Sequence, residues 1–300
     1  MKLTQIRDLV AVAERGSLRA AARQLDTAQP AITRSIRDLE HELGVTLLER
    51  STSGVTLTPI GQAFYRRVSV VQHELRKARE EVLQLKGEGT GTVSVGLATA
   101  PHVALLPGAL RAFQRRFPEV RLNISEGLFP SLESDLRDGR IDFYVGPKAE
   151  DRLSGEYNIE KLSDNLRVAL GRRGHPLRAA KSLRDLTSAR WVSTSVTIES
   201  EAELNPVFER AGLPSPVIAV QAHSALTMIT VAASSDLLAL LPQQWLSFAR
   251  KTKLLDHIAI AEQLLAPAIC IITRARLPLT PVAEHLCDLF RRESMHSAKT

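Results

Sequence analysis

The sequence has few aromatic side chains, few cysteines and no long apolar run, and each of these absences excludes a class of protein. Phe, Trp and Tyr make up 4% of the 300 residues, so the stacked aromatic surfaces that bind single-stranded nucleic acid are not expected. The two cysteines, Cys270 and Cys287, have no CxxC spacing and no histidine at metal-ligand spacing, which predicts buried free thiols and no metal site. Without a secretion signal or an apolar run of membrane-spanning length, we expect a cytoplasmic protein with no membrane partner.

The motifs of common enzymes are also missing. The chain contains no HExxH, no GxxxxGK[ST] and no GxSxG, so a small-molecule enzyme is the weaker alternative and no cofactor is expected. The net charge is +6, yet residues 1–58 contain eight Lys and Arg against seven Asp and Glu. Because this basic charge is not concentrated at the N-terminus, a nucleic-acid function has to be argued from a motif rather than from bulk charge.

Residues 17–40 have the pattern of two short amphipathic helices joined by a tight turn. The second helix carries apolar residues at spacings of four, four and three: Ala28, Ile32, Ile36 and Leu39. Thr27 is the predicted N-cap, and Pro30 falls in the first helical turn, where it removes no helical hydrogen bond. The outward face carries Gln29, Thr33, Arg34 and Arg37, side chains that can reach base edges or phosphates. The segment predicts a DNA-binding helix-turn-helix, although ordinary all-helical proteins also contain such helix pairs.

An ordered set of residues from Leu3 to Gly61 resembles the LysR-type transcriptional regulators. The matching positions include Gly16, Ser17, Ala21, Ala22, Leu25, Gln29, Pro30, Ala31, Ile36, Leu39, Glu40, Leu43, Gly44, Leu47, Leu48, Arg50, Leu57, Thr58 and Gly61. The resemblance implies a winged helix-turn-helix over residues 1–58 that binds double-stranded promoter DNA. The residues expected to contact DNA are Ser17, Arg19, Gln29, Pro30, Ala31, Thr33, Arg34, Arg37, Arg50 and Thr52. The wing, residues 51–56, has Ser53 before Gly54 where the family often has an arginine, which leaves open whether the wing reads the minor groove.

Residues 59–86 have the heptad pattern of a long helix that pairs with a second copy of itself. The apolar positions alternate at spacings of four and three: Phe64, Val68, Val71, Leu75, Ala78, Val82 and Leu85. Packing of this face against the protein's own body is the alternative. A dimer is favoured because two helix-turn-helix units at a fixed spacing can read two half-sites.

The remaining residues alternate between strand and helix patterns in two blocks. Gly87, Gly89 and Gly91 follow a helix and precede a strand, so they predict a hinge rather than a nucleotide loop. The pattern predicts one α/β subdomain from residues 91–163 and 267–300 and a second from 164–266, with crossings near 162–165 and 265–267. This layout resembles the family's effector-binding domain and periplasmic binding proteins. The expected fold is multidomain, an all-α winged helix-turn-helix and linker helix plus two Rossmann-like lobes.

A cleft between two such lobes is expected to bind a small anionic effector, such as a carboxylate or sulfonate. Thr99 is the favoured contact, since the family often has Ser or Thr at the corresponding position. The full set of expected effector residues is Ala98, Thr99, Ala100, Phe129, Lys148, Ser193, Thr194, Ser195, His223 and Ser224. The alternative for the hydroxyls is helix capping, and for Lys148 and His223 it is ordinary surface or packing.

These features together predict a ligand-responsive transcription regulator. The resemblance further implies a homodimer or homotetramer, RNA polymerase as a candidate partner, and control of genes for the catabolism of aromatic compounds. An effector-independent repressor is the main alternative. A solute-binding module would need an export signal, and an architectural DNA-binding protein would not need an effector-sized cleft.

Overall fold

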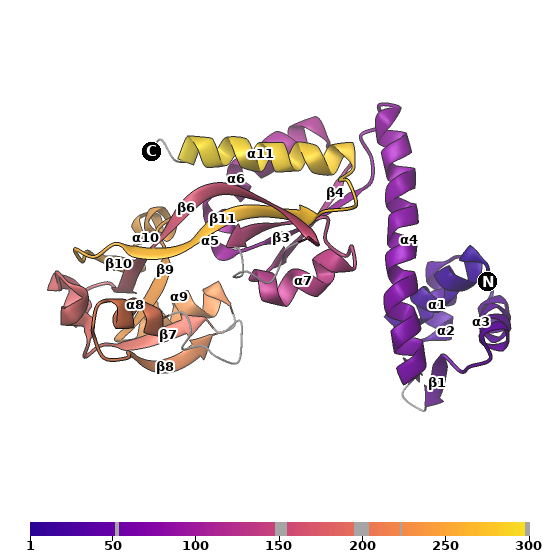
Figure 1. Ribbon diagram of the computed structural model, residues 1–300, viewed down its shortest axis with the longest axis horizontal. Coiled ribbons are helices and arrows are strands. Elements are labelled where there is room, and N and C mark those ends of the chain that lie inside the picture. The colour runs from indigo at the N-terminus through magenta and orange to yellow at the C-terminus, as the bar shows by residue number, and fades with distance from the viewer. Residues whose placement is uncertain (52–53, 148–154, 195–203, 223, 298–300) are drawn as a thin grey trace. The chain divides into compact units, whose positions relative to one another are not determined.

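The structure is a computed structural model that describes residues 1–51, 54–147, 155–194, 204–222 and 224–297. It divides into two units (Figure 1). The first comprises Met1–Glu88 and Arg137–Arg140, and the second comprises Gly89–Leu136 and Ile141–Thr300. The predicted fold class, a helix-turn-helix part followed by an α/β part, is confirmed.

The first unit is built around the two predicted helices and a hairpin. Its elements are α1 (Leu3–Arg15), α2 (Leu18–Gln24), α3 (Gln29–Leu43), β1 (Leu48–Ser51), β2 (Gly54–Leu57) and α4 (Pro59–Leu85). Ala21, Ile32 and Ile36 are buried together, so the small residues of α2 do bring it close to α3. Helix α1, which the sequence analysis did not single out, supplies Leu9 and Val12 to this interior.

The ends of these helices are set by specific residues. Gly16 ends α1 at φ 62°, a left-handed conformation that favours glycine. Ser17 then begins α2, and its Oγ accepts a hydrogen bond of 3.3 Å from the Ala20 amide. The N-cap of α3 is Ala28, without a side-chain cap, so the prediction of Thr27 was wrong by one residue. Thr27 instead donates its amide to the Ala22 carbonyl at 3.0 Å, which closes the turn between the helices.

Hydrogen bonds join the hairpin that forms the wing to the turn before α2 and to helix α3. The Val55 amide donates to the Gly16 carbonyl at 2.9 Å. The Glu40 carboxylate of α3 accepts hydrogen bonds from the amides of Leu47 and Leu48, at 2.7 and 3.1 Å. Because these bonds join main chain to α3 and to the turn before α2, they fix where the wing lies relative to the recognition helix.

Helix α4 shows a change of environment along the predicted seam. Val68 is 5% exposed and packs in the core of the first unit with partly buried Phe64. This corrects the seam at its start, because these two side chains already have partners in their own chain. From Val71 onward the seam is open, with Val71 at 47% and Leu85 at 73% exposed.

Over its described residues, the second unit contains a nine-stranded sheet with two parallel parts, which we call the first and the second lobe. The first part consists of β3 (Thr92–Leu97), α5 (Thr99–Ala104), α6 (Leu106–Arg116), β4 (Arg121–Glu126), α7 (Phe129–Arg137) and β5 (Phe143–Pro147), with β3 parallel to β4 and β5. The second consists of β7 (Arg190–Thr194), α8 (Asn205–Arg210), β8 (Val217–Ala222), α9 (Ala225–Ser234), β9 (Leu237–Pro242), α10 (Trp245–Thr252) and β10 (Leu255–Ile258), with β7 parallel to β8 and β9. Two short 3₁₀ helices lie at Pro176–Ala179 and Leu183–Leu186.

Two long antiparallel strands join these parts, β6 (Tyr157–Arg172) and β11 (Leu264–Arg274) (Figure 1). The predicted crossings at 162–165 and 265–267 lie within them. Their pairing shifts register between Ala266 and Ile269, and there the Asn165 side-chain amide donates to the Pro267 carbonyl at 3.3 Å. The strands therefore form a connection whose regular ladder is interrupted at the point between the lobes.

Separate apolar clusters cover the faces of the sheet in each lobe. In the first, α5, α6 and α11 (Pro281–Ser297) pack on one face, while α7 packs on the other with Tyr144 and Tyr157. In the second, α9 and α10 cover one face, and α8 with the 3₁₀ segments covers the other around Trp191. Each lobe thus has its own core, as expected for two α/β subdomains.

Candidate DNA-binding and effector sites

The outward face of α3 presents the side chains expected to contact DNA. Gln29, Pro30, Ala31, Arg34 and Arg37 are exposed, and Thr33 is half-buried. The Thr33 hydroxyl donates to the Gln29 carbonyl at 3.1 Å, so its oxygen keeps free lone pairs to accept a bond. Among the described residues, neither Arg34 nor Arg37 is in an ion pair, which leaves both guanidinium groups available to bases or phosphates.

Three further predicted contacts lie around this face. Ser17 is the N-cap of α2, so its hydroxyl already accepts a backbone hydrogen bond. Arg19 is exposed on the first turn of α2. The backbone of Arg50 lies in β1, and Thr52 lies outside the described residues.

An open hollow extends the recognition face beyond the residues predicted from sequence. It is lined by Lys2, Thr4, Gln5, Gln29, Pro30, Ala31, Thr33, Arg34, Ser35, Arg37 and Asp38. The start of α1 therefore borders α3, which the sequence analysis missed because the residues are about 30 positions apart. Glu40 was also missed as a positioning residue, since a carboxylate in the last half of a helix gives no sequence signal of its backbone partners.

In the first lobe, the structure places the predicted effector residues at the carboxyl ends of β3 and β4. Thr99 is the first residue of α5, separated from the end of β3 by Ala98, and is half-buried. Ala98 donates its amide to the Val145 carbonyl at 2.9 Å. The side chains of Ala98, Ala100 and Phe129 are buried in the lobe, at 2%, 3% and 1% exposure. Contact of these three residues with an effector would therefore have to use main-chain atoms.

Phe129 is held in an aromatic cluster beneath this edge of the sheet. Its ring lies edge-on to Tyr144 and Tyr157, with centroids 5.3 and 5.6 Å away. Burial raises the pKa of the Tyr144 hydroxyl, which the Phe129 backbone only partly opposes. The Tyr144 side chain is therefore neutral at all ordinary pH values, and the cluster is a rigid support for the edge.

In the second lobe, three of the predicted residues lie at or near the ends of β7 and β8. Ser193 is 2% exposed in β7, and Thr194 ends that strand. Ser224 is the N-cap of α9, with its Oγ accepting from the Thr227 amide at 3.2 Å. Lys148, Ser195 and His223 lie outside the described residues. Thr99 follows the carboxyl end of β3 and Thr194 is the last residue of β7, and ligands of α/β sheets bind at such strand ends.

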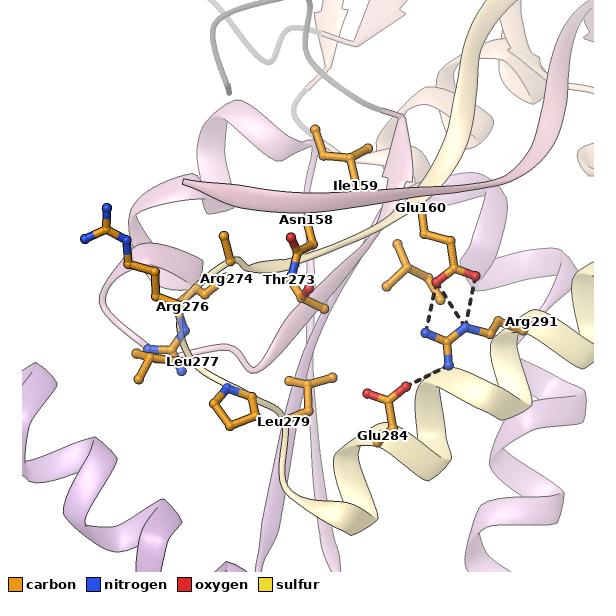
Figure 2. A pocket seen from close by; sticks show the side chains of 13 residues that line it. Asn158, Ile159, Glu160, Thr273, Arg274, Arg276, Leu277, Leu279, Glu284 and Arg291 are labelled. Carbon is orange, nitrogen blue, oxygen red and sulfur yellow. Dashed lines mark hydrogen bonds and ion pairs between the residues drawn. The ribbon is translucent and has the colours of Figure 1, made fainter. Parts of the chain in front are cut away.

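A second hollow of about 540 Å³ lies on the first lobe, between the start of β6, the end of β11 and α11 (Figure 2). At its wall the Arg291 guanidinium donates to Glu160 at 2.9 to 3.1 Å, to Glu284 at 2.8 Å and to Asp288 at 2.6 Å. These carboxylates, Glu160 first, raise the pKa of Arg291. Because the N–H groups of Arg291 already donate to three carboxylates, this side chain joins α11 to β6 and is not available to bind an anion.

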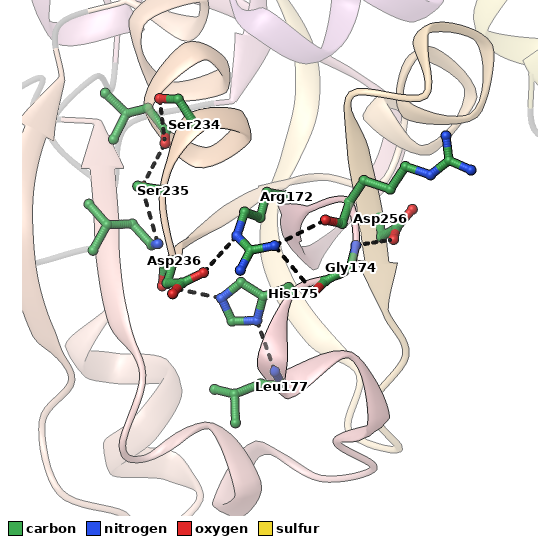
Figure 3. A network of polar contacts seen from close by, with 11 residues as sticks. Arg172, Gly174, His175, Leu177, Ser234, Ser235, Asp236 and Asp256 are labelled. Atoms are coloured by element: carbon green, nitrogen blue, oxygen red, sulfur yellow. Dashed lines mark hydrogen bonds and ion pairs between the residues drawn. The ribbon is translucent and has the colours of Figure 1, made fainter.

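Another polar network closes the turn after β6 in the second lobe (Figure 3). The His175 ring accepts a hydrogen bond from the Leu177 amide at Nδ1, at 3.0 Å, and its Nε2 lies 3.2 Å from the Asp236 carbonyl. With Nδ1 accepting, the proton is assigned to Nε2. Arg172 pairs with Asp236 at 2.7 Å. These contacts join the end of β6 to the residue before β9 and stabilise the second lobe.

The two cysteines lie in separate elements of the second unit, Cys270 in β11 and Cys287 in α11. Cys270 and Cys287 are free and buried, and burial raises the pKa of Cys287 well above its usual value. Over the ranges that the structure describes, no group of three or more His, Cys, Asp or Glu could hold a metal ion. Nor does any helix there have the length and apolar character needed to cross a membrane.

A helix-turn-helix whose second helix presents exposed arginines, followed by an α/β domain of two lobes, is typical of DNA-binding transcription regulators. Residues 3–62 match the family of bacterial regulatory helix-turn-helix proteins of the lysR type, and residues 86–294 match the LysR substrate binding domain. The chain therefore belongs to the LysR family of transcription regulators, and not to a family of enzymes.

Individual relatives agree with this assignment. The chain is 29% identical over 297 residues to the SDS degradation transcriptional activation protein of a Pseudomonas strain, covering 97% of this chain and 96% of that protein. It is 27% identical over 227 residues to the regulator TdcA of Escherichia coli K12, covering 76% and 72%. Its fold is similar to that of CbnR solved with its target DNA, at a TM-score of 0.72 and 23% identity, over 98% of this chain and all of that one.

Proposed function

We propose that this regulator binds promoter DNA through the outward face of α3 and responds to a small anionic effector held between its two lobes. The observation that carries the proposal is the set of exposed, unpaired donors on α3, above all Arg34 and Arg37. Gln29 and Thr33 lie one helical turn apart and Arg34 follows Thr33, so the three side chains can reach neighbouring base pairs in the major groove.

The second half of α4 supplies the dimer contact in this proposal. Val71, Leu75, Val82 and Leu85 are between 47% and 73% exposed, so the seam from Val71 onward presents apolar area that a second copy would cover. Two α3 helices at a fixed separation then bind two half-sites. Further pairing through the effector domains would give the tetramer.

The effector acts by population shift. β6 and β11 connect the lobes at an interrupted ladder, so a ligand that touches both lobes favours one arrangement of them. The arrangement changes the separation of the DNA-binding pairs and the bend of the promoter, and thereby contact with RNA polymerase. The ligand has to bind one arrangement more tightly, because equal affinity for both shifts nothing.

Catabolic genes are the proposed targets. One relative is named as a transcriptional activation protein of SDS degradation. SDS is an anionic alkyl sulfate, which agrees with a sulfonate, sulfate or carboxylate effector here. Aromatic acids are also organic anions, and they are the first candidate effectors to test.

A thermal-shift screen of the full-length protein tests the effector. The panel contains aromatic carboxylates, alkyl and aryl sulfonates, alkyl sulfates, sugar acids and amino acids. A ligand at 100 times its dissociation constant stabilises the folded protein by about 2.7 kcal/mol. We expect an anionic ligand to raise the melting temperature of the native protein and to lose this effect in Thr99→Ala.

Two results contradict this account. A ligand that stabilises Thr99→Ala as much as the native chain would bind away from the β3–α5 junction. A panel without any stabilising ligand favours the alternative, an effector-independent repressor. In that case DNA binding would also be unaffected by every compound in the panel.

A further inference from the structure

We propose that Lys2 and Thr4, at the start of α1, bind a DNA backbone phosphate beside the base pairs that α3 reads. The inference rests on the proposed function of α3. It extends the DNA-binding surface beyond the helix-turn-helix and the wing, to a segment outside the predicted contacts.

The geometry places two different structures on the two flanks of α3. On one flank, a hollow is lined by α2, β1 and β2 through Leu18, Leu48 and Val55. On the other flank, the hollow is lined by Lys2 and Thr4 of the α1 start. The two hollows share only Thr33 and Arg37 of α3, so the outward ridge of the recognition helix runs between them.

A helix in the major groove has a phosphate backbone on each side, because the groove is about 12 Å wide and bounded by both strands. The wing and α2 are placed to meet one strand. The opposite strand would meet the flank formed by the start of α1. The side chains there are suited to it, since lysine ammonium and threonine hydroxyl groups are common donors to phosphate oxygens.

The local contacts leave these two side chains ready to bind. Both are exposed. The Lys2 backbone amide donates to the Gln5 side-chain oxygen at 2.6 Å, and Gln5 is buried, so the main chain at this point is anchored. In the described residues the Lys2 ammonium is in no ion pair and the Thr4 hydroxyl makes no hydrogen bond.

The charge of the lining also favours a phosphate. Lys2, Arg34 and Arg37 contribute three positive charges to the hollow, and Asp38 is the single acid among its lining residues. A phosphate on the α1 side would be attracted by Lys2 without displacing a native salt bridge. Such contacts set the position of a protein on DNA but carry no base preference.

The test measures binding of the full-length protein to two duplexes over a range of salt concentrations. One duplex is obtained by selection from a random library with the native protein, and the other has a scrambled sequence. We expect Lys2→Gln to weaken binding to both duplexes by the same factor. The slope of the logarithm of the binding constant against the logarithm of the salt concentration should become less steep by about 0.9, the value for one phosphate contact. Thr4→Val should weaken both duplexes without changing the slope.

Lys86→Gln is the matched control, because Lys86 is an exposed lysine at the end of α4 and does not line the hollow. It removes the same charge and is expected to leave the slope unchanged. Melting temperatures of all variants verify that the folds are intact.

Three results would overturn the inference, and they are distinguishable. An unchanged slope in Lys2→Gln, with Arg34→Ala losing base preference, would remove Lys2 from the interface and leave the proposed function standing. A changed base preference in Lys2→Gln would make Lys2 a base-reading residue. Native binding by both Lys2→Gln and Arg34→Ala would refute the α3 surface itself.

Discussion

At the residue scale, Gly61 matters because it has no side chain at a point where two segments of main chain meet. Gly61, near the start of α4, lies against the main chain of Leu47, and an added Cβ would overlap the Leu47 carbonyl oxygen. The Leu47 amide is in turn bonded to Glu40. The glycine therefore allows α4, the wing and α3 to meet at one point.

Gly61→Ala is expected to destabilise the first unit by about 1 to 3 kcal/mol, the usual cost of overpacking. The contact is with main chain, so it cannot be relieved by rotating a side chain. Hydrogen exchange of α1 to α3 in the full-length protein measures the effect.

Gly108→Ala in α6 is the control for this change. The three atoms nearest to its added Cβ belong to the carboxylate of Glu293, which can move away, and alanine is the better helix former. Protection of α1 to α3 in Gly61→Ala equal to that of the native chain would show that the unit tolerates the contact.

His257 of β10 gives a pH-dependent prediction. Burial, and next the charge of Arg250, lower its pKa below 6.5. The unfolded chain then binds a proton that the folded chain excludes, so His257 reduces the free energy of unfolding as pH falls through and below about 6.5. Denaturant titrations between pH 7.5 and 5 should show a smaller loss for His257→Asn than for the native chain. If the free energy of unfolding fell equally with pH in both chains, His257 would not contribute to the pH dependence of stability.

At the element scale, periodicity predicted α2 and α3 because each helix buries one regular face. The alternation of strand and helix patterns predicted two α/β lobes but not the bounds of their elements. The seam of α4 was only partly predictable. Its spacing is uniform from Phe64 to Leu85, but Val68 packs in its own domain and Val71 is exposed. Sequence spacing reports which residues share a face and not what covers that face. The hollow between α1 and α3 could not be predicted, because it depends on tertiary packing of distant segments.

The exposed part of the seam carries a prediction about assembly. Replacing Val71 and Leu75 by Glu puts like charges at the proposed helix pairing and is expected to dissociate the dimer. Analytical ultracentrifugation should then show a smaller species.

Gln62→Glu with Arg66→Glu is the control, since these exposed positions lie off the seam on the same helix. The control pair should keep the native mass. An unchanged assembly in the Val71 and Leu75 variant would show that α4 does not hold the dimer.

At the scale of the whole molecule, the chain combines a DNA-reading unit and a two-lobed α/β unit. The lobes have separate apolar clusters and are joined by β6 and β11, and Val103 of α5 also packs against the α9–α10 cluster of the second lobe. The proposed effector residues at the carboxyl ends of the strands were predicted mainly by their position along the chain. Their burial in the structure differs. Phe129 is buried and supports the edge of the sheet, while Thr99 is partly accessible.

The most direct measurement is the selection of duplexes from a random library by the native protein and by Arg34→Ala, followed by affinity measurement at fixed salt. The account predicts that the native chain selects a sequence with two half-sites. It also predicts that Arg34→Ala binds this duplex about 1 to 3 kcal/mol more weakly, with preference lost at one position in each half-site. Selection of the same sequence with the same affinity by Arg34→Ala would contradict the assignment of α3 as the reading surface.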